Sequence, residues 1–227
     1  MTGSPDWEDE RLTALADGCG VVVASVAYRL APEDPYPAAL DDVTDALAWA
    51  TLKGRGEYRV QRVLVAGESA GANLAVAAMV RLRDRLGSVA VDGAALAYGF
   101  FDLRLTRSAR RMPRPFLGLD AATLTWFRAQ YAAAEAVSNP ELSPVLADLS
   151  RLPPALMVVG TADPLRDDSV LLAGRWRAAG NAARLHLVPG GAHGCDLLPF
   201  DSPAARELVR ARSRFIDEIL CGGPGGS

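Results

Sequence analysis

Short apolar runs alternate along the chain with segments in which apolar residues recur at helical spacing. The runs are typical of strands buried on both faces of a parallel sheet and cover residues 21–28, 62–66, 94–98, 155–160 and 184–188. Helices are predicted between and around them, over residues 4–17, 39–50, 70–86, 168–179 and 204–220. Gly18 is expected to end the first helix. This alternation predicts an α/β fold with a mostly parallel sheet flanked by helices.

One segment interrupts the alternation. Residues 104–148 contain no convincing strand, although the stretch 121–134 has helical character. We therefore expect a core formed by residues 1–103 and 149–227, with residues 104–148 inserted as a small helical cap over the carboxyl ends of the strands. The aromatic residues of this cap either line an acyl pocket or pack internally; they are Phe116, Trp126, Phe127 and Tyr131.

Composition narrows the classes of function without selecting one. The 227 residues suffice for one domain, or for one domain with a small insertion. The formal net charge of −3 argues against a nucleic-acid binder, which normally carries a basic surplus. No apolar stretch approaches the roughly 20 residues of a membrane span, and residues 1–6 lack the pattern of a signal peptide. We therefore expect a cytoplasmic protein without a membrane or nucleic-acid partner.

Metal and disulfide chemistry are not expected. Cys19, Cys195 and Cys221 form an odd, widely spaced set without a CxxC pattern. The chain has only two histidines, which are too few for a typical zinc cluster. No metal or organic cofactor is predicted.

The strongest chemical signal is the pentapeptide Gly67-Glu68-Ser69-Ala70-Gly71. Its pattern, G-x-S-x-G, is short and occurs by chance, but here it follows a predicted strand and precedes a predicted helix. Small residues around the serine permit the sharp turn of a nucleophile elbow. Ser69 is therefore the predicted nucleophile, and the N–H of Ala70 is predicted to donate to an oxyanion. The alternative is a Gly/Ser-rich turn without chemistry.

A serine hydroxyl is a poor nucleophile without a base, and the candidates are His186 and His193. His186 lies inside the predicted strand 184–188, where a structural role is expected. His193 lies in the loop after this strand, and loops at the carboxyl ends of parallel strands are where such a sheet places its site. We predict that His193 is the base.

The third member of a triad is a carboxylate that orients the histidine. Asp163 follows the predicted strand 155–160 and is the predicted residue. Asp167 and Asp168 are rivals, although both are also suited to cap the next helix. The order of Ser69, Asp163 and His193 along the chain is the order expected for an α/β-hydrolase.

The chain resembles the hormone-sensitive-lipase-like family of α/β-hydrolases. The segments that carry the resemblance are 28–33 (YRLAPE), 36–39 (YPAA), 67–75 (GESAGANLA), 152–155 (LPPA), 163–167 (DPLRD) and 191–194 (GAHG). Together they cover almost the whole chain in order. The resemblance implies a carboxylic ester hydrolase with Ser69, Asp163 and His193 as its triad, and Glu68 as a neighbour of the elbow rather than a catalytic acid.

The sequence departs from this family in one respect. The resemblance implies a His-Gly-Gly motif ahead of the segment matching residues 2–4, whose amides would supply most of the oxyanion hole; the sequence contains no such motif. It also implies a further strand between those at 21–28 and 62–66. We therefore expect an N-terminally truncated α/β-hydrolase fold. A misassigned start, a fragment and a genuine short variant each explain this departure.

These residues and the resemblance predict a serine carboxylesterase that hydrolyses short or medium acyl esters through an acyl-enzyme. Its partner would be a small-molecule ester, and the family resemblance allows a homodimer. Two alternatives stay open. An incomplete oxyanion hole would suit a hydrolase-fold binding protein with impaired catalysis, and an acyltransferase or lactonase would use the same triad.

Overall fold

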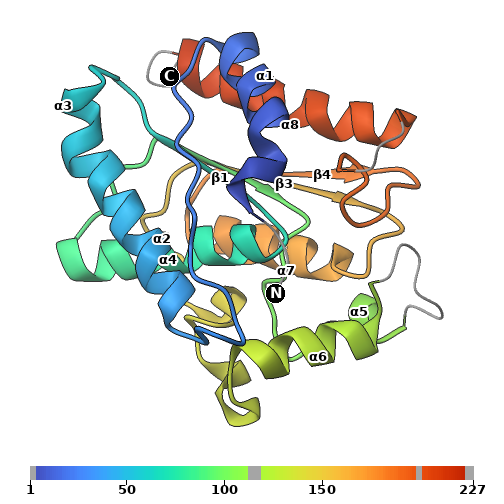
Figure 1. Cartoon of the computed structure of the whole chain (residues 1–227). Helices are drawn as coiled ribbons and strands as arrows, with labels where there is room; N and C mark the ends of the chain where they lie inside the picture. Colours follow the sequence, from blue (N-terminus) through green and yellow to red (C-terminus); the bar gives the residue numbers. More distant parts are fainter. Residues whose placement is uncertain (1–3, 112–118, 198–200, 223–227) are drawn as a thin grey trace.

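One parallel sheet organises the chain. The computed structural model describes residues 4–111, 119–197 and 201–222, and within them the sheet has four strands. The strands are β1 (Leu64–Glu68), β2 (Gly93–Ala97), β3 (Ala155–Gly160) and β4 (Ala183–Val188). Their order across the sheet is their order along the chain, and each neighbouring pair is parallel. Their carboxyl ends therefore lie at the same edge of the sheet (Figure 1).

Helices cover both faces of this sheet (Figure 1). On one face lie α1 (Asp9–Cys19) and α8 (Pro203–Cys221), and on the other α4 (Ala70–Leu86) and α7 (Arg166–Ala178). α2 (Ala38–Trp49) packs against α4. Shorter elements are α3 (Arg55–Glu57), α5 (Arg107–Arg111), α6 (Ala121–Tyr131), the 3-10 turns Pro5–Glu8, Ala134–Ser138 and Pro144–Leu146, and the π-helical turn Ala50–Gly54.

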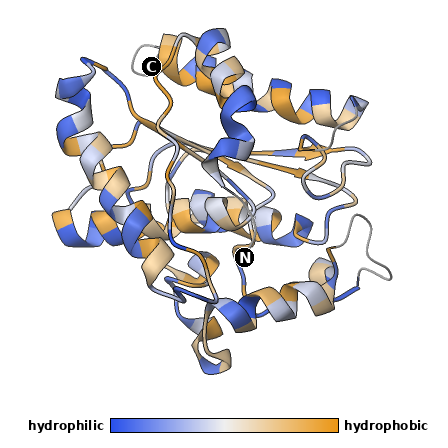
Figure 2. Cartoon of the chain, viewed as in Figure 1, coloured by the Kyte–Doolittle hydropathy of each residue, from blue (hydrophilic) through white to orange (hydrophobic). Residues whose placement is uncertain are grey.

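Burial on both faces explains the continuous apolar sequence of the central strands. Along β2, Ala94 and Leu96 join the hydrophobic cluster under α4 and α7, whereas Ala95 and Ala97 join the cluster under α8. Successive strand residues point to opposite faces, so each face of β2 requires an apolar side chain. The covering helices have hydrophobic and hydrophilic sides (Figure 2).

Most of the predicted elements are confirmed. The strand 155–160 and the helix 70–86 coincide with β3 and α4. The strands predicted over 62–66 and 94–98 differ from β1 and β2 by two and by one residue at each end, and the strand predicted over 184–188 differs from β4 by one residue at its start. The segment 104–148 contains α5, α6 and two 3-10 turns, and its status as a separate cap stays a prediction.

The strand predicted over residues 21–28 is wrong. In the structure this segment is chain without regular structure, and among the described residues only β2 pairs with β1. A strand needs a neighbour that exchanges backbone hydrogen bonds with it, and apolar sequence alone does not supply one. The segment consequently carries apolar residues at the surface (Figure 2), and Val22 is 62% exposed.

The first helix also ends later than expected. α1 continues through Gly18 to Cys19, and Gly20 ends it in the left-handed conformation with φ 62°. Its N–H donates to the carbonyl of Ala16. Glycine adopts a positive φ without steric penalty, so the second glycine rather than the first ends the helix.

Candidate active site

Ser69 occupies a sharp turn between β1 and α4. Its backbone angles, φ 51° and ψ −117°, lie outside the regions that non-glycine residues normally adopt. Gly67 makes this turn sterically feasible, because a Cβ at that position would lie 2.5 Å from the carbonyl oxygen of Gly71. The N–H of Ser69 donates to the carbonyl of Ala97 at 3.0 Å, which fixes the turn to β2. The pentapeptide thus has the strand-turn-helix geometry predicted for it.

The structure brings together Ser69, His193 and Asp163, the three predicted triad residues. The Oγ atom of Ser69 lies 3.0 Å from Nε2 of His193, and Nδ1 of His193 lies 3.0 Å from Oδ2 of Asp163. Asp163 is 2% exposed, and its Oδ1 accepts a hydrogen bond from the N–H of Leu165 at 2.7 Å. A buried carboxylate held in this way fixes both the position and the tautomer of the imidazole.

Two glycines allow the acid loop and the histidine loop to meet. A Cβ on Gly160 would lie 1.9 Å from the carbonyl oxygen of Gly191, so the two backbones pass in direct contact. That same carbonyl accepts a hydrogen bond from the N–H of Ala162 at 3.0 Å. Asp163 directly follows Ala162, and His193 lies two residues after Gly191. This role of the two glycines was not predicted, although a glycine at the end of a strand is a signal of close backbone approach.

The alternative candidates for the base and the acid of the triad make other contacts. His186 is in β4, where its Nε2 lies 3.0 Å from Oε1 of Glu207 on α8. Asp167 accepts a hydrogen bond from the N–H of Ser108 at 3.0 Å. The predicted capping role of Asp167 and Asp168 is wrong: α7 begins at Arg166 without a side-chain cap, and both carboxylates bind the segment 102–108 instead.

Ala70 is the first residue of α4. The first amides of a helix have no partner within the helix, and the helix dipole places partial positive charge there. A free N–H at this position is the kind of group expected to donate to an oxyanion. The role predicted for it stays a prediction.

The predicted pocket aromatics are only partly placed. Phe116 lies outside the described residues. Trp126 is 56% exposed and its ring centroid lies 5.3 Å from that of Phe127, in an edge-to-face arrangement. Their lining of an acyl pocket stays a prediction. Tyr131 packs against Tyr36 at 6.1 Å, which is internal packing.

Glu68, which precedes the nucleophile, joins three elements below the elbow. Its carboxylate accepts hydrogen bonds from Arg11 of α1 and Arg212 of α8. Burial works to raise the pKa of this carboxyl, but the two guanidinium groups outweigh it and hold the pKa below its usual value. Glu68 is therefore an ionised anchor between α1, β1 and α8.

A second buried carboxylate belongs to Asp196, three residues after His193. Its side chain is fully buried, and its Oδ1 accepts a hydrogen bond from the hydroxyl of Tyr98 at 2.8 Å. Its Oδ2 has no hydrogen-bond partner among the described residues and lies 3.6 Å from Arg212 and 3.8 Å from Arg11. Tyr98 also places its ring edge-to-face against His193, with centroids 4.9 Å apart. The segment around His193 is thus fixed to Tyr98, which directly follows β2, and to the charges beneath Ser69.

Neither Tyr98 nor Asp196 was predicted as part of the site. Tyr98 was the last residue of the predicted strand 94–98, and Asp196 lies two residues beyond the predicted histidine loop, 189–194. Burial raises the pKa of the Tyr98 phenol well above its usual value, with the neighbouring carboxylates adding to the effect. The phenol therefore stays a hydrogen-bond donor at neutral pH.

Asp168 is a third buried acid, beneath the segment that leads into α5. It accepts hydrogen bonds from the N–H of Asp102 at 2.9 Å and from the hydroxyl of Thr106 at 2.6 Å. Burial raises its pKa to about 7 despite these two donors, and the nearby carboxylate of Asp102 adds to the rise. Asp168 is therefore a group whose charge changes near neutral pH.

The part of the chain that the structure describes offers neither a metal-binding cluster nor a membrane-spanning helix. No group of three or more His, Cys, Asp or Glu side chains in that part of the chain is arranged to hold a metal ion. No helix there has the length and apolar character needed to cross a membrane.

Comparison with known proteins identifies the family. A family model described as an alpha/beta hydrolase fold matches residues 1–197, most of the chain. The chain belongs to the α/β-hydrolase family. This membership confirms the predicted fold class, and the solved relatives of this α/β-hydrolase confirm the resemblance noted in the sequence.

The similar proteins carry esterase names. The chain is 36% identical over 197 residues to an ethyl acetate hydrolase of Pseudomonas putida, covering 85% of this chain and 62% of the relative. It is 36% identical over 218 residues to the carboxylesterase NlhH of Mycobacterium tuberculosis, covering 91% and 66%. This α/β-hydrolase chain thus spans under two thirds of the length of either relative.

Solved structures agree with the fold. EstE1, a thermophilic carboxylesterase cloned from a metagenomic library, superimposes with a TM-score of 0.89 at 34% identity, covering 96% of this chain and 76% of that one. A hormone-sensitive lipase from a metagenome library gives 0.88 at 33% identity, covering 97% and 73%.

Proposed function

We propose that this α/β-hydrolase is a serine carboxylesterase that hydrolyses short or medium acyl esters through an acyl-enzyme. The observation that carries the proposal is the unbroken chain of contacts from Ser69 Oγ to His193 Nε2 and from His193 Nδ1 to Asp163. The esterase names of its relatives support the reaction class.

The geometry supports a two-step reaction. Ser69 Oγ attacks the ester carbonyl while His193 Nε2 takes its proton, and His193 then gives that proton to the departing alcohol. Asp163 stabilises the imidazolium that forms between these two transfers. Water then attacks the acyl-enzyme while His193 Nε2 takes a proton from it, and His193 returns this proton to Ser69 Oγ as the acid leaves.

The negative charge that develops on the carbonyl oxygen needs hydrogen-bond donors. The Ala70 N–H at the start of α4 is the donor proposed from this chain. Removal of one oxyanion donor typically lowers kcat by about 10²–10³. The rate of ester hydrolysis therefore depends on how many donors act in addition to the Ala70 N–H, whereas the triad determines which reaction is catalysed.

Turnover of p-nitrophenyl acetate and butyrate tests the proposal. Purified protein should release p-nitrophenol, and Ser69→Ala should abolish the release. Ser88→Ala is the matched control, because Ser88 is exposed and remote in sequence from the triad. Full activity in Ser69→Ala would exclude Ser69 as the nucleophile.

The acid is tested by a second matched pair. Asp163→Asn should lower kcat by about 10⁴, the loss expected when the histidine is held in the wrong tautomer. Asp167→Asn should leave kcat near that of the parent, because Asp167 binds Ser108 and Arg166 instead. Equal losses in the two variants would refute the assignment of Asp163.

A homodimer and a cytoplasmic location stay predictions. Sedimentation tests the first, and cell fractionation tests the second.

A further inference from the structure

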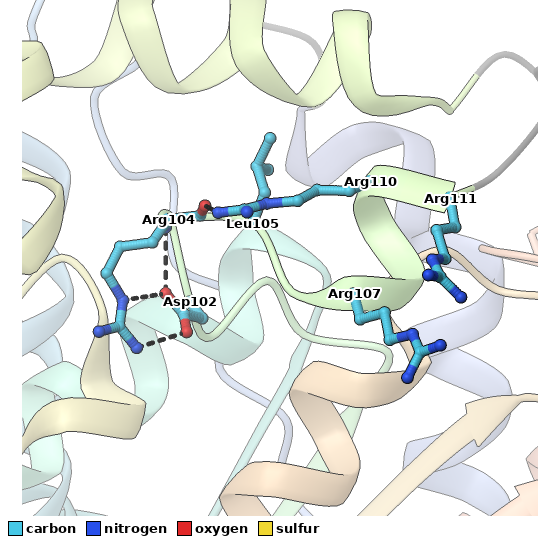
Figure 3. A pocket seen from close by; sticks show the side chains of 6 residues that line it. All are labelled: Asp102, Arg104, Leu105, Arg107, Arg110 and Arg111. Carbon is cyan, nitrogen blue, oxygen red and sulfur yellow. Dashed lines mark hydrogen bonds and ion pairs between the residues drawn. The ribbon is translucent and has the colours of Figure 1, made fainter.

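An open surface pocket outside the triad is lined mainly by exposed arginines, and we refer to it as the arginine pocket. Its volume is about 410 Å³, and it is formed where the segment after β2 leads into α5 (Figure 3). The residues that line it are Asp102, Arg104, Leu105, Arg107, Arg110 and Arg111. Four guanidinium groups and one carboxylate therefore line the pocket, in a chain whose formal net charge is −3.

Contacts within the pocket compensate only part of this charge. Asp102 neutralises Arg104 through two hydrogen bonds of 2.8 and 2.7 Å, and Arg110 donates to the carbonyl of Arg104 at 2.8 Å. Arg107 and Arg111 have no hydrogen-bond or ion-pair partner among the described residues. They lie one helical turn apart on α5, and Figure 3 shows their side chains extending to the same side. Like charges at this spacing repel each other, so an anion between them would be stabilising.

Other arginines of the chain show the contrast. Arg29 is paired with Asp42 at 2.8 Å and Arg55 with Asp92 at 2.5 Å, although both arginines are partly exposed. The fold thus supplies carboxylates at several of its surface guanidinium groups. Arg85 and Arg214 likewise have no hydrogen-bond or ion-pair partner among the described residues, so what distinguishes Arg107 and Arg111 is that both line the same pocket.

The arginine pocket is built on the segment that links the two sides of the candidate active site. At one end of this segment, the N–H of Phe100 donates to the carbonyl of Ser69 at 3.4 Å. At the other end, the hydroxyl of Ser108 donates to the carbonyl of Pro164 at 2.7 Å, and Pro164 follows Asp163 directly. The segment that carries the pocket is therefore hydrogen-bonded near its two ends to the nucleophile turn and to the acid loop.

We propose that the arginine pocket binds an oxyanion group, a carboxylate or a phosphate, with Arg107 and Arg111 as its main ligands. The planar guanidinium fork matches the oxygen spacing of both groups. This inference rests on the proposed ester hydrolysis, and it names the substrate class as esters with a negative charge away from the scissile bond. A free anion has the same chemistry as a substrate-borne one, so the experiment treats the two sources in separate arms.

The substrate arm uses two p-nitrophenyl esters of equal chain length, the neutral pentanoate and the glutarate monoester, whose far end is a carboxylate. The ratio of kcat/KM, glutarate over pentanoate, is measured in the parent protein and in Arg107→Gln/Arg111→Gln. This ratio should fall by about tenfold in the double variant, the loss expected for about 1.4 kcal/mol of charge-assisted binding. Pentanoate turnover should stay unchanged. Arg85→Gln/Arg214→Gln is the control with the same change in net charge, on α4 and α8.

The binding arm uses Ser69→Ala protein, which needs no turnover. Calorimetric titration with inorganic phosphate and with glutarate, at constant ionic strength, should give binding that Arg107→Gln/Arg111→Gln abolishes and the control pair retains. A lowered kcat/KM ratio supports a substrate-borne anion, and binding without a change in ratio supports a free anion at the same pocket. An unchanged ratio together with no binding overturns the proposal. Absence of pentanoate turnover would refute the esterase proposal alone, because the binding arm still decides the pocket.

Discussion

Tyr98→Phe tests whether the histidine loop is held in place by the buried hydrogen bond to Asp196. The substitution removes one hydroxyl and keeps the ring that packs against His193 at 4.9 Å. The lost bond is 2.8 Å long, and the other oxygen of Asp196 has no hydrogen-bond partner in the described structure. After the substitution, the only groups that still compensate the Asp196 carboxylate in the described structure would be the more distant guanidinium groups of Arg11 and Arg212.

The expected loss follows from that arrangement. A hydrogen bond to a charged group contributes about 1.5–3 kcal/mol to stability. Because Tyr98→Phe leaves a buried carboxylate without this bond, we expect its free energy of unfolding to fall by about 2–3 kcal/mol. The loop that carries His193 would also become less well positioned. A three- to tenfold fall in kcat, or about 0.7–1.4 kcal/mol, is expected with KM unchanged.

Tyr36→Phe is the matched control. Tyr36 also donates its hydroxyl to a carboxylate, that of Glu141, but Arg81 binds the same carboxylate through bonds of 2.7 and 2.8 Å. Its loss of stability should be smaller, about 1 kcal/mol, and kcat should not change. Urea unfolding gives the stabilities and p-nitrophenyl butyrate gives kcat and KM. A Tyr98→Phe protein with the kcat of the parent would refute a positioning role for the Tyr98 hydroxyl.

Two further predictions concern the acid loop and pH. Gly160→Ala should lower kcat by roughly 10² or more, because its Cβ would meet the Gly191 carbonyl at 1.9 Å and separate the two loops. Gly174→Ala is the control and should keep the kcat of the parent, because a Cβ there meets nothing within 4 Å. Equal activities of the two variants would contradict the role of Gly160. The pKa of Asp168 is about 7 in the folded state against about 3.9 in the unfolded chain, so the folded state holds the proton more tightly. The parent should therefore lose stability as the pH rises from about 4 to about 7, by on the order of 4 kcal/mol at most. Asp168→Asn should flatten that fall in urea titrations, and an unchanged pH profile would contradict the raised pKa.

The sequence predicted best the features that local pattern determines. The strand predicted over 155–160 coincides with β3 because burial on both faces requires a continuous apolar run. The helix predicted over 70–86 coincides with α4 because burial on one face makes apolar residues recur at helical spacing. The positions of Ser69, Asp163 and His193 after strands were sufficient to predict that they meet, since all carboxyl ends of a parallel sheet share one edge.

The features that failed or were missed depend on distant partners. Residues 21–28 have the composition of a strand, but pairing depends on a neighbour that composition does not reveal. The contacts of Glu68 with α1 and α8, and of Tyr98 with the loop of Asp196, join residues far apart in sequence. No local pattern encodes such contacts, so they emerge only from the folded chain.

Labelling of the folded protein with a fluorophosphonate tests the central claim most directly, because this probe reacts with a serine only when its hydroxyl is activated. Peptide mass spectrometry should find a single adduct, on Ser69, that disappears in Ser69→Ala, in His193→Ala and after denaturation. An unlabelled folded protein, or an adduct on another serine, would contradict the account of Ser69 as an activated nucleophile.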